Sequence, residues 1–311
     1  MNTIFVDGAA GTTGLEIGER LAGRPDLKLL TLSESARKDP AARREALNSA
    51  DVVILCLPDA AAREAVALVD NPRTRIIDAS SAHRTTPGWI YGFAEFLPGQ
   101  ATRIAEAKRV SNPGCYPTGF LALVRPLIDV GLVEPDHPVT VNALSGYSGG
   151  GKSMIAEFEG TAATARPRIY ATSLAHKHVP EMQQHAGLSH PPLFAPSVGN
   201  FYRGMVVEVP LALWALKTRP SGADLRRVLA ERYAGCELVA VAHDEECQTT
   251  TQVQAESLAR TDRLKLFVFA NEAARQARLV AVLDNLGKGA AGAAVQNLNL
   301  MLGLPAATGL F

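Results

Sequence analysis

The sequence predicts an α/β protein in which a doubly wound parallel sheet precedes an α+β domain. Short apolar runs alternate with helical patterns through the N-terminal third of the chain. These runs carry apolar residues on both faces, which is typical of parallel strands that helices cover on each side. The length of 311 residues, with 47% hydrophobic positions, is enough for two domains with buried cores.

The elements follow in order along the chain. In the first part, strands are expected at 3–6, 27–32, 52–57 and 75–77, with helical stretches between them. Turn-forming residues are dense at 111–117, so we place the domain junction there and predict domains at 1–116 and 117–289. The second domain is expected to have helices at 119–130 and 222–233 and strands at 139–144, 205–213, 237–242 and 279–283. A last helix at 290–302, within 290–311, is expected to pack back on the first domain.

Composition and charge exclude several classes of partner. Lys+Arg and Asp+Glu both number 31, so no positive excess favours nucleic acid or an anionic membrane. Neither a leader pattern nor an apolar run of membrane-spanning length is visible, so a cytoplasmic protein with a small-molecule substrate is expected. The four cysteines have neither zinc-ligand nor C-x-x-C spacing, so neither a metal site nor a disulfide scaffold is expected.

A glycine-rich turn follows the first strand and opens a helical pattern. Glycines there allow a tight turn in which amide groups at the positive end of a helix face a pyrophosphate. The spacing is G-x-x-G-x-x-G, and an ordinary strand-to-helix turn is the alternative. The residues expected to bind a dinucleotide cofactor are Gly8, Ala10, Gly11, Thr12, Thr13 and Gly14.

The end of the second strand favours NADPH over NADH. NAD-specific proteins usually place an acidic residue there for the ribose 2′-hydroxyl, whereas Leu30, Thr31 and Leu32 are neutral. Hydroxyls and a cation suited to a 2′-phosphate follow at Ser33, Ser35 and Arg37, although a solvated polar loop is the alternative.

Cys115 is the candidate nucleophile. It lies in Ser-Asn-Pro-Gly-Cys-Tyr-Pro-Thr, immediately before a predicted helix, where the helix N-terminus stabilises a thiolate. By contrast, Cys56 lies inside a predicted apolar strand, and Cys236 and Cys247 are expected to be packing or surface residues. A nucleophilic cysteine beside a nicotinamide site suggests attack on an activated acyl group to give a thioester, which hydride then reduces to an aldehyde.

Such chemistry needs a base and an oxyanion donor. His178 is the first choice for the base, because Glu181 lies three residues further along a helix that Pro180 starts and can orient the imidazole. His176 is expected to bind substrate oxygens, and the opposite assignment of the two histidines stays open. The Asn112 amide and the Cys115 backbone N–H are the candidate oxyanion donors.

A second glycine-rich loop follows the strand at 139–144. Residues 146–153 literally match G-x-x-x-x-G-K-[ST], but a P-loop would stand at the first strand of a nucleotide domain. We therefore expect a substrate loop for phosphate or carboxylate, with Arg84 as a weaker anion-binding candidate. The loop residues expected to contact substrate are Ser145, Gly146, Ser148 and Gly149.

These motifs resemble the short form of the N-acetyl-gamma-glutamyl-phosphate reductases over nearly the whole chain. The resemblance rests on the segments already described and on 200–205 and 284–292. It implies NADPH-dependent reduction of N-acetyl-L-glutamyl 5-phosphate to the 5-semialdehyde in arginine biosynthesis, through a thioester on Cys115. It also implies a Rossmann-like NADP-binding domain, an α+β substrate and dimerisation domain, and a homodimer or homotetramer.

Two other readings stay open. Aspartate-semialdehyde dehydrogenases share the architecture and chemistry but normally place Asn directly before the cysteine, where this chain has Gly114. A non-catalytic NADP-sensing scaffold would have no need of Cys115, His178 and Glu181 together. One departure from the longer family form is His83, beside Arg84, which leaves the role of that arginine open.

Overall fold

The computed structural model describes residues 1–160 and 166–311. The chain divides into two compact units, which are described separately. Unit 1 comprises Met1–Gly114 with Ala290–Leu310, and unit 2 comprises Cys115–Gly289 with Phe311. The units part after Gly114, whereas the sequence placed the junction after residue 116.

Unit 1 is built on a parallel six-stranded sheet in the order β2-β1-β3-β4-β6-β5. Its strands are β1 (Asn2–Asp7), β2 (Leu27–Leu30), β3 (Val52–Leu55), β4 (Arg75–Asp78), β5 (Ile90–Tyr91) and β6 (Arg109–Ser111). The chain runs outward from β1 to β2 and returns to β3 on the other side of β1. The order therefore reverses at the carboxyl ends of β1 and β3, where such sheets bind ligands.

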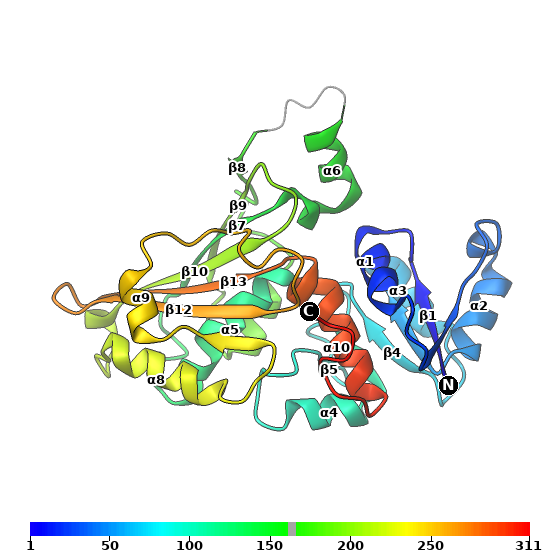
Figure 1. Ribbon diagram of the computed structural model, residues 1–311, viewed down its shortest axis with the longest axis horizontal. Coiled ribbons are helices and arrows are strands. Elements are labelled where there is room, and N and C mark those ends of the chain that lie inside the picture. The colour runs from blue at the N-terminus through cyan, green and yellow to red at the C-terminus, as the bar shows by residue number, and fades with distance from the viewer. Residues whose placement is uncertain (161–165) are drawn as a thin grey trace. The chain divides into compact units, whose positions relative to one another are not determined.

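Helices cover both faces of this sheet, as predicted from strands with apolar residues on both faces. Ile4 and Ile54 pack into one core with Ile17 of α1 and Val295 of α10, whereas their strand neighbours pack into a second core on the opposite face with α2 and α3. Helix α10 also packs against α4 (Figure 1). The helices are α1 (Thr12–Leu21), α2 (Pro40–Ser49), α3 (Asp59–Ala67), α4 (Gln100–Glu106) and α10 (Gly292–Met301), with a 3₁₀ turn η1 (Ala36–Lys38).

Unit 2 contains a mixed seven-stranded sheet in the order β11-β12-β13-β10-β7-β9-β8. Its strands are β7 (Thr140–Ser145), β8 (Arg168–Ile169), β9 (Leu193–Val198), β10 (Met205–Ala212), β11 (Val239–Val241), β12 (Leu264–Asn271) and β13 (Gln276–Leu283). Helix α5 lies against β10 and β13, and α8 packs on β12 (Figure 1). The helices are α5 (Cys115–Asp129), α6 (Gly151–Glu159), α7 (Val179–Ala186), α8 (Gly222–Arg232) and α9 (Asp244–Thr249), with 3₁₀ turns η2 (Tyr147–Gly150) and η3 (Leu213–Ala215) and a π-helical turn η4 (Gly287–Ala291).

Helix α5 starts earlier than the predicted residue 119. Its first residue is Cys115, and Pro117 is tolerated because the first helical turn needs no N–H donors. Pro126, inside the helix, leaves the carbonyl of Ala122 without its usual donor, and the Tyr233 hydroxyl donates to that carbonyl at 2.9 Å. The helix therefore continues through the proline to Asp129.

The described residues include no helix with the length and apolar character needed to cross a membrane.

Candidate active site

The glycine turn after β1 requires glycine at two of its positions. Gly8 has a φ of +86°, and a Cβ there would lie 2.3 Å from the Cys56 carbonyl oxygen. A Cβ on Gly14 would lie 2.5 Å from the carbonyl oxygen of Gly8. Gly11 is the N-cap of α1 and provides no side-chain cap, so the positive end of the helix is left for an anion. The predicted residues Ala10, Thr12 and Thr13 lie in this same turn and helix start.

A cavity of about 310 Å³ joins this turn to the loop after β2. Its lining includes Asp7, Gly8, Ala9, Gly14 and Arg37. The exposed Ser33 and Ser35 hydroxyls lie 3.1 Å apart in the same loop. The cavity therefore brings the glycines of the turn and a cation of the loop after β2 together, and the binding of a dinucleotide there stays a prediction.

Cys56 follows β3 and is not inside it, contrary to the prediction. The strand ends at Leu55, and the Cys56 amide donates to the Asp7 carbonyl at 2.8 Å. Burial, together with the negative charges of Asp78 and Asp7, raises the pKa of the Cys56 thiol to about 12. The Cys56 thiol is therefore protonated at neutral pH and is a poor nucleophile.

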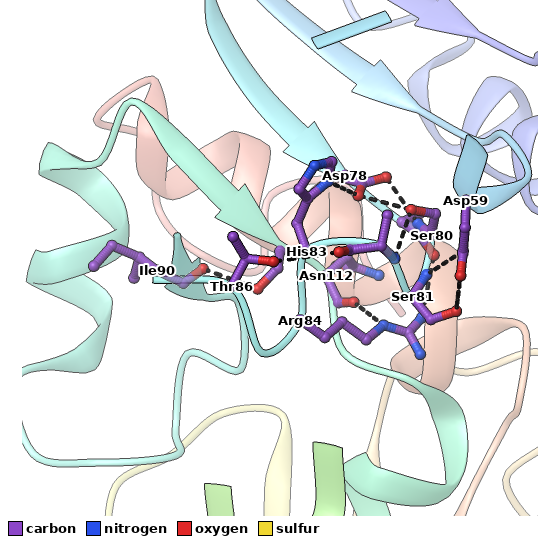
Figure 2. A network of polar contacts seen from close by, with 12 residues as sticks. Asp59, Asp78, Ser80, Ser81, His83, Arg84, Thr86, Ile90 and Asn112 are labelled. Atoms are coloured by element: carbon purple, nitrogen blue, oxygen red, sulfur yellow. Dashed lines mark hydrogen bonds and ion pairs between the residues drawn. The ribbon is translucent and has the colours of Figure 1, made fainter. Parts of the chain in front are cut away.

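A polar network fixes the segment that leads to Cys115 (Figure 2). Asp78 accepts hydrogen bonds from the Ser80 hydroxyl at 2.7 Å and from His83 Nδ1 at 2.6 Å. The His83 ring also stacks on Trp89, with ring centroids 4.1 Å apart. His83 thus holds the turn that carries Arg84.

Arg84 is buried in this network. It donates to the backbone carbonyl of Asn112 at 3.0 Å (Figure 2) and to that of Ala79 at 3.1 Å. These two bonds tie the guanidinium to the backbone, and anion binding by Arg84 stays a prediction.

The side chain of Asn112 is also committed within unit 1. Its Nδ2 donates to the Ala290 carbonyl at 2.9 Å, and its Oδ1 accepts from Asn297 at 3.0 Å. The backbone N–H of Asn112 donates to the backbone carbonyl of Asp78 at 2.7 Å. These contacts favour Asn112 as a support for the Cys115 segment, and its oxyanion role stays a prediction.

Cys115 is the first residue of α5 and is partly exposed. The chain packs tightly behind it, because a Cβ on Gly289 would lie 2.8 Å from the Cys115 Cβ. Gly289 belongs to the π-helical turn η4, and such turns often occur at functional sites. A glycine at 289 therefore leaves room for the candidate nucleophile.

Tyr116, next to Cys115, brings both histidines to the start of α5. Its ring meets those of His176 and His178 edge-on, with centroids 5.9 and 5.8 Å away. Its hydroxyl lies 2.6 Å from that of Tyr170. Burial raises the pKa of Tyr170 to about 12, and the charge of Cys115 also raises it. The thiol, the tyrosine pair and the histidines thus form one cluster.

His178 directly precedes α7, and Glu181 lies in its first turn; both side chains are buried. Pro180 is at the start of the helix, as predicted. The backbone N–H of His178 donates to His176 Nδ1 at 3.1 Å. Because Nδ1 is an acceptor, a neutral His176 carries its proton on Nε2 and can donate it to a substrate oxygen.

The glycine-rich loop after β7 is held by unit 2 itself. The backbone N–H groups of Gly146 and Ser148 donate to the carbonyls of Gly204 and Tyr202 at 2.9 and 3.0 Å. The Ser148 hydroxyl accepts from Asn285 at 2.9 Å. Ser145 is buried at the end of β7, whereas Gly149 is exposed.

Sequence reasoning missed the residues that support these groups. Asp284 and Arg203 form a buried ion pair at 2.7 Å, which fixes the loop that holds Gly146. Tyr170 and the Asp7–Arg43 ion pair were missed as well. The segments 200–205 and 284–292 entered the sequence analysis only through the family resemblance. Their Arg, Asp and Asn residues were the signal from which these supporting contacts could have been predicted.

Two family models match the chain. The NAD binding domain of the semialdehyde dehydrogenases matches residues 3–104, and their dimerisation domain matches residues 115–285. The chain therefore has a nicotinamide-nucleotide domain of this family followed by a dimerisation domain.

Curated relatives match over nearly their full length. N-acetyl-gamma-glutamyl-phosphate reductase of Trichormus variabilis is 52% identical over 99% of this chain and 98% of its own. The Burkholderia ambifaria protein of that name is 53% identical over 98% and 97%, and the Brucella anthropi protein is 54% identical over 96% and 98%.

Solved structures share the fold at low identity. Aspartate semialdehyde dehydrogenase II of Vibrio cholerae has a TM-score of 0.74 at 15% identity, covering 97% of this chain and 98% of that one. Aspartate semialdehyde dehydrogenase of Candida albicans, determined with NADP, has a TM-score of 0.64 at 13% identity, covering 96% and 98%. The chain belongs to the semialdehyde dehydrogenase family and, within it, to the N-acetyl-gamma-glutamyl-phosphate reductases.

Proposed function

We propose that the chain reduces N-acetyl-L-glutamyl 5-phosphate to N-acetyl-L-glutamate 5-semialdehyde with NADPH and releases phosphate, as a step of arginine biosynthesis. The observation that carries the proposal is the cluster at the start of α5, where Tyr116 packs next to Cys115 and against both His176 and His178. The names of the curated relatives support the substrate.

Cys115 is the nucleophile in this proposal. Its sulfur attacks the acyl carbon, the bond from that carbon to the phosphate oxygen breaks, and a thioester forms. His178 takes the thiol proton and Glu181 stabilises the resulting imidazolium. His176 holds a substrate oxygen through Nε2. After reduction the carbon–sulfur bond breaks, and His178 returns the proton to the departing Cys115 thiolate.

When bound, NADPH supplies the hydride that reduces the thioester. The glycine turn from Gly8 to Gly14 would hold its pyrophosphate. The preference for NADPH is proposed from Ser33, Ser35 and Arg37, which offer two hydroxyls and a cation where an NAD site has a carboxylate.

The substrate is proposed to lie against the loop after β7. Ser145, Gly146, Ser148 and Gly149 would contact its phosphate or carboxylate, with Arg84 as a further anion ligand. The two proposed oxyanion donors are the backbone N–H of Cys115 and the Asn112 amide.

The reverse reaction tests the proposal. Phosphate-dependent reduction of NADP is measured with N-acetylglutamate semialdehyde and, separately, with aspartate semialdehyde. The acetylated aldehyde is expected to be preferred. Preference for aspartate semialdehyde would instead identify an aspartate-semialdehyde dehydrogenase.

Thiol alkylation tests for a non-catalytic sensor. Alkylated enzyme is expected to lose turnover while it keeps NADPH binding, whereas a sensor would show no turnover to lose. The cytoplasmic location and the homodimeric or homotetrameric state stay predictions.

A further inference from the structure

The Asp7–Arg43 ion pair lies at the cofactor cavity of unit 1. We propose that Arg43 neutralises Asp7 and so allows the glycine turn to accept an anionic dinucleotide. This inference rests on the proposed NADPH site and assigns a charge-compensating residue to it.

The position of Asp7 creates the need for a partner. Asp7 is the last residue of β1, directly before Gly8, and it lines the same cavity as Gly8, Ala9 and Gly14. Its side chain is only 11% exposed. A carboxylate beside the turn that would hold a pyrophosphate repels the ligand, because charges in a partly buried site are weakly screened.

Arg43 supplies the compensating charge from a neighbouring element. It lies in the first half of α2, and its Nε donates to Asp7 Oδ2 at 2.7 Å. The Arg43 side chain is 20% exposed, so water screens the pair only in part. The pair therefore contributes no net charge at the phosphate end of the cavity.

The same edge of the sheet carries a second carboxylate with its own partner. Asp78 ends β4 and is bonded to His83. Both carboxylates act on the intervening Cys56 thiol. Burial raises the pKa of this thiol most, and the negative charges of Asp78 and Asp7 also raise it. The carboxylates of Asp7 and Asp78 therefore lie near enough to the end of β3 to act on the residue that follows it.

The contacts of Arg43 favour a role in charge compensation. Within residues 1–160 and 166–311, its Nη2 is buried and makes no hydrogen bond. Leaving such a donor unsatisfied costs free energy, so hydrogen bonding alone does not account for an arginine here. Direct donation from Nη2 to the cofactor is the competing explanation, and the experiment separates the two.

The experiment measures dissociation constants of NADPH and NADH by fluorescence titration for Arg43→Gln, Asp7→Asn and the double variant. Arg43→Gln is expected to weaken both cofactors roughly tenfold, because an uncompensated charge then faces the pyrophosphate that they share. The ratio of the two constants is expected to stay unchanged. The double variant is expected to return to within about threefold of the wild type, because it removes the charge of Asp7 as well.

Arg44→Gln is the matched control. Arg44 is the next residue of α2, and its partner Asp70 is exposed, so this variant loses a similar ion pair away from the cavity. Its cofactor affinity is expected to equal that of the wild type. If Arg43→Gln does not fold, Asp7→Asn alone decides, and it is expected to bind NADPH at least as tightly as the wild type.

Two results would overturn the inference. A double variant as weak as Arg43→Gln would show that Arg43 contacts the cofactor itself, and a large loss in Asp7→Asn would show that the carboxylate binds it. A wild-type protein that binds neither cofactor would instead defeat the proposed function.

Discussion

Cys115, Cys56 and Cys247 differ in what surrounds their sulfur atoms. Cys115 is partly exposed at the start of α5, beside Tyr116 and Gly289. Cys56 lies between two carboxylates, and burial raises the pKa of its thiol to about 12. Cys247 is buried in a small core with Phe267. The surroundings therefore favour Cys115 as the reactive thiol.

The raised pKa of Cys56 predicts a loss of stability in alkali. Below the ordinary thiol pKa of 9.0, Cys56 is protonated in the folded and unfolded chains, so it adds no pH dependence. Between pH 9 and 12 only the unfolded chain loses the proton, and the free energy of unfolding falls by up to about 1.4 kcal/mol per pH unit. Urea unfolding of Cys56→Ala is expected to show a shallower fall than the wild type. Parallel curves from pH 9 to 11 would contradict the raised pKa.

The two histidines are expected to respond differently to substitution. His178→Asn removes the proposed base and is expected to lower kcat by roughly 10²–10⁴-fold with NADPH affinity unchanged. His176→Asn is expected to raise KM more than it lowers kcat, because His176 is proposed to hold substrate. Steady-state kinetics and NADPH titration check both variants. A large kcat loss confined to His176→Asn would reverse the two assignments.

At the scale of elements, the tight contact between η4 and α5 positions the nucleophile. A Cβ on Gly289 would collide with Cys115, so Gly289→Ala is expected to shift the thiol and lower kcat by about 10–100-fold. The rate of Cys115 alkylation is expected to fall as well.

Gly119→Ala is the control for this prediction. A Cβ on Gly119, on the same helix, would lie 2.9 Å from the side chain of Val207. Gly119→Ala is therefore expected to lower the melting temperature without a matching loss of Cys115 alkylation rate. Equal losses in both variants would show that Gly289→Ala acts only through stability.

Local patterns predicted most elements, but several predicted ends differ from the observed ones. The apolar run at 3–6 lies within β1, and the run at 205–213 nearly coincides with β10. Strand β9 was missed because Pro196 argues against a strand, yet β9 pairs with β7 along its length. Strand β12 was missed although Phe267, Val268 and Phe269 favour a strand.

At the scale of the whole molecule, the fold class was predictable because it depends on apolar runs and a glycine turn, both local signals. The supporting contacts were not predictable, because they join residues far apart in the sequence. Tyr116 meets Tyr170, and Arg203 meets Asp284, only once the register of the unit 2 sheet is set. Local spacing predicts Cys115 and His178 as the reacting residues, but it does not predict the groups that contact them.

The proposed mechanism requires one covalent state of the enzyme, the Cys115 thioester. In phosphate-free buffer, N-acetylglutamate semialdehyde and NADP are expected to form the Cys115 thioester, which then accumulates because no phosphate is present to release it. Cys115→Ser is expected to form no adduct while it keeps NADPH affinity within a few-fold, because a hydroxyl is a much weaker nucleophile than a thiolate.

Mass spectrometry of that reaction shows whether Cys115 carries the acyl group. The predicted result is a burst of about one NADPH per active site together with an N-acetylglutamyl group on the peptide that contains Cys115. The contradicting result is either no burst and no adduct, or an adduct on a residue other than Cys115.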